Sequence, residues 1–177
     1  MWYILKMYIL PIPKNVHISW GDNYIKVSGV LGSVIKKKAN FELAQENSNL
    51  YIYSKIFDNT LHLYVSMIKG LMIGVSKGYR HKLKLIGVGF KARIEKQKLI
   101  LKIGYSHDVI YNIPEDIKIF HSKLKGTILL LKGKEKYRVN QIASEIRTIR
   151  KPDSYKGKGI HKQDEILKLK KGKRDGK

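Results

Sequence analysis

The stretch that decides the fold is residues 83–103, which read LKLIGVGFKARIEKQKLILKI. Residues 87–92 match the G-x-G-x-x-A spacing of dinucleotide-binding proteins, but that motif needs a helix to begin at once, so that its N-terminus meets the pyrophosphate. Here apolar and charged residues alternate instead, which predicts a strand over residues 83–94, and the alternation changes phase at a glycine, which indicates a β-bulge. Residues 95–97 then turn the chain into a second strand. We therefore predict a hairpin and reject a nucleotide site.

Helices are predicted in two places. Apolar residues recur at helical spacing over about 60–78, after the capping candidates Asn59 and Thr60. The same spacing begins near Val139 and stops near Arg150, because the residue before a proline is disfavoured in a helix. The other apolar segments alternate or run between Gly, Asn, Asp and Pro, as strands do. They are residues 16–20, 24–27, 50–53, 83–94, 99–103, 109–113, 117–120 and 127–131.

The order of these elements repeats. An offset of about 75 residues takes Gly29 onto Gly104 and Val34 onto Val109, as an internal duplication would. The predicted fold class is α+β, with two tandem copies of an antiparallel sheet packed on one helix, followed by a basic C-terminal tail. The predicted divisions are an N-terminal extension (1–13), a first repeat (14–80), a second repeat (81–151) and the tail (152–177).

Positive charge is concentrated in the second half. The chain has 177 residues, 36 Lys or Arg and 14 Asp or Glu, for a formal net charge of +22. Residues 1–79 hold nine basic and four acidic side chains, whereas residues 80–177 hold 27 and ten. A surface this basic needs a polyanionic partner, and we expect nucleic acid before membrane.

Catalytic and metal-binding patterns are not found. The absence of cysteine excludes disulfides, thiolate-metal sites and a cysteine nucleophile. Ser106 and His107 are neighbours on an extended chain, so their side chains point to opposite faces and cannot act as nucleophile and base. The six histidines are scattered without metal-ligand spacing. We predict no enzyme activity, no cofactor, no metal and no small-molecule substrate.

The basic run that starts at Lys151 is the strongest binding candidate. Tyr155 offers a stacking face, and two glycines between lysines allow the backbone to follow an irregular surface. The predicted phosphate contacts here are Lys156, Lys158 and Lys162.

These segments resemble one family. Residues 87–92, the G-Y-S-H motif at 104–107 and the P-x-x-Y-K-G-K-G-I motif at 152–160 occur in the order and spacing of bacterial-type large-subunit ribosomal protein six. The resemblance is near-continuous from about residue 80 to 173, while residues 10–79 match only in layout. The family's usual K-G-P-K-G-like loop is replaced by Ser-Gly-Val-Leu-Gly at 28–32.

The resemblance implies a structural constituent of the large ribosomal subunit. Its second repeat would dock on ribosomal RNA near the sarcin-ricin loop and the site where translational GTPases act. Its partners would be large-subunit ribosomal RNA and neighbouring ribosomal proteins. It implies no catalytic residues. The RNA-binding residues that follow from the resemblance and from the charge pattern together are Lys91, Arg93, Tyr105, Ser106, His107, Lys151, Tyr155, Lys156, Gly157, Lys158, Gly159 and Lys162.

Composition also indicates the source. The excess of Lys over Arg and of Ile over Ala is typical of an AT-rich gene. The apolar N-terminus is too short for a membrane span and lacks the features of a transit peptide, so we expect the protein to be made where it works. A mitochondrial ribosome is the favoured location, with a plastid or a bacterial cytoplasm as alternatives. The alternative functions are another RNA-binding protein or a protein of anionic membrane surfaces.

Overall fold

The structure is a computed structural model that describes residues 6–39, 41–54, 60–121, 127–163 and 165–171. The chain divides into two compact units, Met1–Tyr79 and Arg80–Lys177, and each is described by itself. The capping candidate Asn59 lies outside the described residues.

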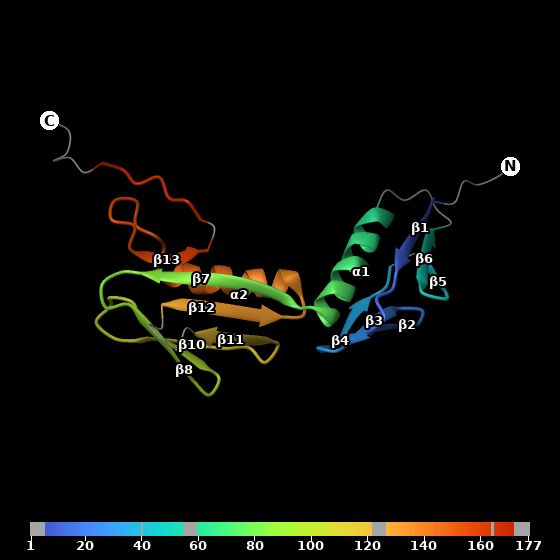
Figure 1. The fold of residues 1–177 in the computed structure, drawn as a ribbon, viewed down its shortest axis with the longest axis horizontal. Coiled ribbons are helices and arrows are strands. Elements are labelled where there is room, and N and C mark those ends of the chain that lie inside the picture. The colour runs from blue at the N-terminus through green and yellow to red at the C-terminus, as the bar shows by residue number, and fades with distance from the viewer. Residues whose placement is uncertain (1–5, 40, 55–59, 122–126, 164, 172–177) are drawn as a thin grey trace. The chain divides into compact units, whose positions relative to one another are not determined.

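The first unit consists of two three-stranded antiparallel sheets and one helix (Figure 1). One sheet has the order β1-β6-β5 and the other β2-β3-β4. Helix α1 (Leu61–Ser76) packs its apolar face on these sheets, and the Leu31 amide donates to the Val75 carbonyl at 3.0 Å, which ties the β3–β4 turn to the end of the helix. The strands are β1 (Lys6–Pro11), β2 (Val16–Trp20), β3 (Tyr24–Gly29), β4 (Gly32–Lys37), β5 (Glu42–Glu46) and β6 (Asn49–Ser54).

The second unit repeats this plan and adds a strand. Its sheets have the orders β10-β9-β8 and β11-β12-β7-β13, and helix α2 (Lys136–Ile149) packs on β12 and β13 through Val139, Ile142, Ala143 and Ile146. The strands are β7 (Tyr79–Ile86), β8 (Lys91–Glu95), β9 (Lys98–Lys102), β10 (Val109–Asn112), β11 (Ile117–His121), β12 (Ile128–Gly133) and β13 (Gly159–Lys162).

The two units correspond element by element. The strand order β1-β6-β5 of the first unit reappears as β7-β12-β11 in the second, and β2-β3-β4 reappears as β8-β9-β10. Strand β13 is the addition, because it pairs with the outer edge of β7, whereas no described strand pairs with the outer edge of β1. The predicted α+β class and both predicted helices are confirmed, although each unit holds two sheets rather than one.

One detail of the sequence prediction is corrected. Residues 83–94 do not form one bulged strand: β7 ends at Ile86, Gly87–Phe90 make a turn, and β8 belongs to a different sheet. Gly87 lies where the chain passes from one sheet to the other. This passage moves the buried side chains from odd-numbered positions in β7 to even-numbered positions in β8, as a bulge within one strand also would. The hairpin turn between β8 and β9 is confirmed.

Four strands were not predicted, and two of them bear on the predicted divisions. Strand β1 lies within residues 1–13 and is hydrogen-bonded to β6 of the first unit. Strand β13 lies within residues 152–177 and is hydrogen-bonded to β7 of the second unit. The other two are β4 and β5. No helix in the described ranges is long and apolar enough to cross a membrane.

Candidate nucleic-acid interface

Three loops of the second unit meet around the side chain of Arg150. Its guanidinium carbon lies 5.5 Å from the centre of the Phe90 ring and 5.0 Å from the centre of the Tyr105 ring. Its Nη1 donates to the Gly104 carbonyl at 3.4 Å, and the Tyr105 hydroxyl donates to the Ile149 carbonyl at 2.8 Å. The end of α2, the turn before β8 and the loop after β9 are thereby held together. We call the turn 87–90, the loop 104–108 and the loop 151–158 that follows Arg150 the loop cluster.

The predicted contact loop at 105–107 is exposed. Tyr105 keeps half of its surface accessible although its hydroxyl is bonded, and Ser106 and His107 are exposed beside it. The ring of Tyr105 thus has one partner in Arg150 and accessible surface left for another. Ser106 and His107 have no hydrogen-bond partner among the described residues.

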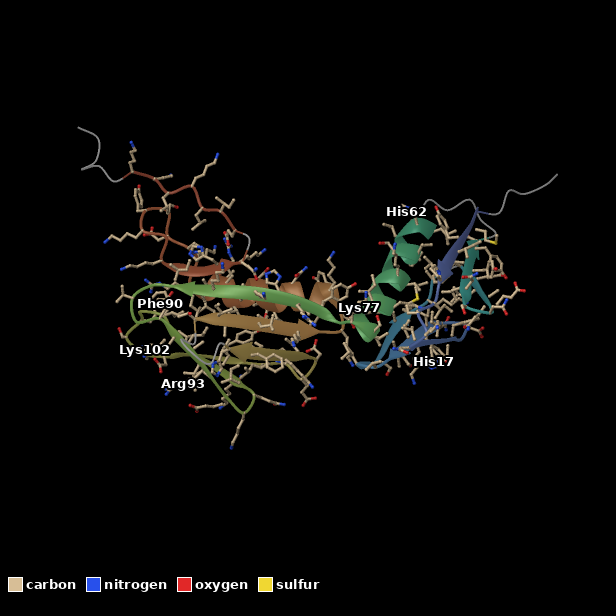
Figure 2. All side chains as sticks on the ribbon, viewed as in Figure 1. His17, His62, Lys77, Phe90, Arg93 and Lys102 are labelled. Atoms are coloured by element: carbon tan, nitrogen blue, oxygen red, sulfur yellow. The ribbon has the colours of Figure 1, made fainter. Side chains whose placement is uncertain are left out.

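Strand β8 presents the predicted cations Lys91 and Arg93 on its exposed face, because the intervening Ala92 is buried. Figure 2 shows Arg93 on this strand and Lys102 on the neighbouring strand β9. Lys91 is the register partner of Lys102, so two lysines lie side by side where β8 begins. Arg93 differs from them, because it bonds Asp108 at 3.3 Å and lies 3.7 Å from Glu95. Its charge is already compensated in part.

The loop after Arg150 is held by its own hydrogen bonds. The Asp153 carboxylate accepts from the backbone amides of Lys156 at 3.0 Å and Tyr155 at 3.2 Å, and these bonds lower the pKa of that carboxyl. The Asp153 amide donates to the Lys158 carbonyl at 2.9 Å, which closes the loop. The side chains of Lys151, Tyr155, Lys156 and Lys158 remain exposed on it. The lysines are therefore presented from a fixed backbone, which lowers the entropy lost when they bind a ligand.

The two glycines beside these lysines are buried, and glycine is favoured at each for a different reason: Gly157 has φ +66°, whereas packing restricts position 159. Gly159 has φ +150°, and a Cβ there would lie 2.7 Å from the Lys151 carbonyl oxygen. The Gly157 carbonyl is 2.7 Å from Nε2 of the buried His161, which must carry the proton because a carbonyl only accepts. That these glycines let the backbone follow an irregular surface stays a prediction. In the structure, Gly159 permits close packing against Lys151 and Pro152.

Lys162 is separated from these loops. It is the register partner of Leu83, while Gly159 is the partner of Ile86 at the loop end of β7. Three residues of strand span about 10 Å, so Lys162 does not belong to the loop cluster.

Sequence reasoning missed Arg150, Asp153 and His161, which position the loops. In the sequence, Arg150 marks only the end of a helix, because its partner Phe90 is 60 residues away. The proline at 152 and the Asp-Ser-Tyr run that follows it were the available signal for a turn. In the described ranges, no group of three or more His, Asp or Glu side chains is placed to hold a metal ion.

Exposed lysines on hydrogen-bonded loops, next to an accessible aromatic ring, are typical of the class of proteins that bind the phosphate backbone of a nucleic acid. Comparison with known proteins gives the family. The sequence model of the family described as ribosomal protein L6 matches residues 86–163.

Full-length relatives extend this match over both units. The chain is 39% identical to large ribosomal subunit protein uL6m of Reclinomonas americana, over 93% of this chain and 95% of that protein. It is 38% identical to uL6 of Mesoplasma florum over 96% of each, and 32% identical to uL6 of Fervidobacterium nodosum over 92% of this chain and 94% of that protein.

The chain belongs to the uL6 family of large-subunit ribosomal proteins. It is a structural, RNA-binding component of the ribosome and not an enzyme, with ribosomal RNA and other ribosomal proteins as its partners.

Proposed function

We propose that the loop cluster around Arg150 docks the second unit on large-subunit ribosomal RNA near the sarcin-ricin loop, beside the site where translational GTPases act. The observation that carries this proposal is the Asp153-closed loop, which presents Lys156 and Lys158 on a fixed backbone. Lys91 and Lys102 add charge at the start of the β8–β9 hairpin, and Tyr105 adds an accessible ring. Such a surface suits folded RNA, which proteins recognise mainly through shape, phosphates and 2′-hydroxyls.

The residues that we propose to contact RNA in this cluster are those of the predicted set on the three loops and on β8. The side chains of Lys91, Tyr105, Ser106, His107, Lys151, Tyr155, Lys156 and Lys158 are all exposed. Arg93 is a weaker contributor, because binding a phosphate would compete with Asp108 and Glu95. Gly157 and Gly159 contribute by shaping the loop.

The test is a filter-binding titration of the full chain against a transcript that contains the sarcin-ricin region, at several salt concentrations. Truncation after Lys151 would be a poor test, because it also removes β13 from the sheet. The Lys156→Gln, Lys158→Gln double variant is expected to leave the fold intact, because both side chains are exposed. It is expected to reduce the slope of log affinity against log salt by about 2 and the affinity by about tenfold.

The matched control removes the same two charges from exposed positions of the first unit, in the Lys14→Gln, Lys37→Gln variant. An equal loss in both double variants would mean that only net charge matters, and the assigned surface would be rejected. No loss in the Lys156, Lys158 variant would also reject it.

We further infer that the ribosome concerned is mitochondrial. The AT-rich composition and the 39% identity to a protein named uL6m support this, although the bacterial relative from Mesoplasma is nearly as similar at 38%. A plastid or a bacterial cytoplasm is the alternative. Sucrose-gradient sedimentation of lysed, purified mitochondria, probed with an antibody to this chain, tests the inference. Cosedimentation with the large subunit is expected, and absence of the chain from mitochondria would overturn it.

A further inference from the structure

Residues 165–171, which follow β13, run back across the loop 151–158 that carries Lys156 and Lys158. We call residues 165–171 the strap. Figure 1 shows this segment, in red, beside the loop. The sequence predicts it only as part of the basic tail, and none of its residues belongs to the predicted RNA-binding set. What it contacts in the structure suggests a more specific role.

The start of the strap is anchored on α2 and β13. The Glu165 carboxylate forms a bidentate pair with Arg147 of α2. The same carboxylate accepts from the Lys162 amide at 3.1 Å, and the Glu165 amide donates to the Lys162 carbonyl at 3.2 Å. The side chains of Arg147 and Glu165 are only 29% and 19% exposed, so water screens the ion pair only in part. The strap therefore begins at a fixed point of the second unit.

The far end of the strap contacts the loop on both sides of Lys156. The Lys170 amide donates to the Ser154 carbonyl at 2.9 Å. The side chain of Leu169 lies against Gly157, because a Cβ built on this glycine would be 3.5 Å from Cδ2 of Leu169, an ordinary van der Waals distance. Ser154 comes two residues before Lys156, and Gly157 follows it directly. The strap thus holds the backbone that carries this lysine.

The hydrogen bonds within the loop converge on one exposed residue. The Asp153 carboxylate accepts from the amides of Tyr155 and Lys156, its carbonyl accepts from the Gly157 amide at 3.0 Å, and its amide donates to the Lys158 carbonyl. Asp153 is exposed, so water competes for these bonds. Exposed backbone hydrogen bonds in a loop open more easily than those of a core. Contacts from the strap would keep such a loop closed.

The strap itself lies on the surface and adds little to the core. Leu169 is 57% exposed and Ile166 is 93% exposed. Removing so little buried surface has a small effect on global stability. The effect of the strap is therefore expected to be local, on the order of the loop.

We propose that the strap is a positioning segment for RNA binding, with the Leu169 side chain and the Lys170 amide as its positioning groups. By holding Ser154 and Gly157, it keeps Lys156 in place before RNA arrives, so that less conformational entropy is lost on binding. Neither positioning group needs to touch RNA. The proposal rests on the proposed function, because it takes the loop 151–158 as an RNA contact.

The first experiment compares two apolar positions of the strap in the full chain, with the titration described above. Leu169→Ser is expected to bind the sarcin-ricin transcript about threefold to tenfold more weakly, with an unchanged salt slope because no cation is removed. Leu169→Met keeps an apolar contact and is expected to restore the affinity. Ile166→Ser is the matched control, since Ile166 is also apolar but almost fully exposed, and it should bind like the unaltered chain.

The second experiment tests the Lys170 amide. Lys170→Gln and Lys170→Pro remove the same charge, but only proline removes the amide hydrogen. The proline variant is expected to bind about threefold more weakly than the glutamine variant. Both variants should unfold at the same urea concentration as the unaltered chain, because Lys170 is exposed.

The third experiment measures the order of the loop without RNA, by hydrogen exchange of the full chain followed by NMR. The amides of Lys156 and Gly157 are expected to exchange faster in Leu169→Ser than in Ile166→Ser. The Leu85 amide, which donates to the Thr127 carbonyl beside the sheet, is the reference and should not change.

The outcomes separate the strap from the proposed function. Equal affinities of Leu169→Ser and Ile166→Ser, or of Lys170→Pro and Lys170→Gln, would show that the strap does not position the loop. A salt slope reduced by about 1 in Leu169→Ser would mean that a phosphate contact was lost, and would also overturn the proposal. If Lys156→Gln, Lys158→Gln weakens binding and Leu169→Ser does not, the proposed function stands and the strap proposal fails. If the unaltered chain does not bind the transcript, the proposed function fails, whereas unchanged loop exchange in Leu169→Ser refutes the strap proposal alone.

Discussion

Arg150 shows how a cation in an RNA-binding protein can serve the fold rather than the ligand. Its planar guanidinium lies near two aromatic rings and bonds one carbonyl, so its position is set by three contacts from two loops. An ammonium group has no planar face for stacking and does not present a fixed fork of donors. We therefore regard Arg150 as a positioning residue for Tyr105 and the loop that carries Lys156.

This role predicts the effect of Arg150→Lys, which keeps the charge and loses the planar group. The second unit is expected to lose about 1 kcal/mol of its free energy of unfolding, because the interactions with Phe90 and Tyr105 are weakened. Urea denaturation followed by tyrosine fluorescence measures this loss. Lys151→Arg is the control, since Lys151 is exposed, and it is expected to have no effect. Unchanged stability of Arg150→Lys would show that the stacking does not hold the loops.

A second prediction for a single residue concerns Gly159. A Cβ at this position would meet the Lys151 carbonyl oxygen and the Pro152 backbone at 2.7 Å, in a backbone conformation that side chains rarely adopt. Gly159→Ala is expected to cost at least about 2 kcal/mol in unfolding free energy, measured by urea denaturation. Gly89→Ala, at φ +74° with no atom within 4 Å of the added Cβ, is expected to cost only about 1 kcal/mol. Equal costs would mean that the close packing against Pro152 is not what requires the glycine.

The residue scale also shows what a sequence can reveal about a site. The exposure of the lysines in the loop cluster was predictable, because cations between glycines in a basic run rarely lie inside a protein; that they bind RNA stays a prediction. The position of Arg150 was not predictable, because it depends on Phe90, which only the fold brings near it. A run of charge is visible in the sequence, whereas a contact between distant segments is not.

Among the elements, β13 is the clearest case of a strand whose formation depends on the strand that it pairs with, here β7. The four residues Gly-Ile-His-Lys lie in a lysine- and glycine-rich run without strand alternation. They form a strand because the edge of β7 offers hydrogen-bonding groups and because Ile160 is buried against the second unit. Strands such as β2 and β11 were predictable, since their own residues alternate. β1, β4, β5 and β13 depend on tertiary contacts that overrule weak local preference.

The end of β13 is fixed to α2 by the pair between Glu165 and Arg147, which predicts a pH dependence. The pKa of Glu165 is lowered in the folded state from its ordinary value of 4.5. Its contribution to stability is therefore fully present above about pH 4.5 and is lost as the pH falls through the lowered folded value. Glu165→Gln is expected to destabilise the chain by about 1–3 kcal/mol at pH 7.

Urea denaturation at a series of pH values measures both effects. The difference between the unaltered chain and Glu165→Gln should shrink as the pH falls below 4.5. The exposed Glu115, which lies in a turn, provides the control substitution Glu115→Gln. A difference that stays constant down to acid pH would show that the carboxylate charge of Glu165 does not fix β13.

At the scale of the whole molecule, one topology occurs twice with different charge. The first unit and the second unit share six corresponding strands and a helix, yet residues 1–79 carry nine basic and four acidic side chains while residues 80–177 carry 27 and ten. Strand β13 and the loop cluster are both features of the second unit. Since the shared fold cannot account for this asymmetry, we expect RNA affinity to reside mainly in the second unit.

The prediction is tested by separating the units between Tyr79 and Arg80. Each unit has its own buried core, and one of about 100 residues is large enough to fold alone. Residues 80–177 are expected to show cooperative thermal unfolding by circular dichroism. They are also expected to keep most of the salt slope that the full chain shows with the sarcin-ricin transcript, because that slope counts the phosphates that are neutralised. Residues 1–79 are expected to bind the transcript at least about tenfold more weakly. Equal slopes for the two fragments would show that the charge of the second unit does not serve RNA binding, and the loop cluster would lose its assigned ligand.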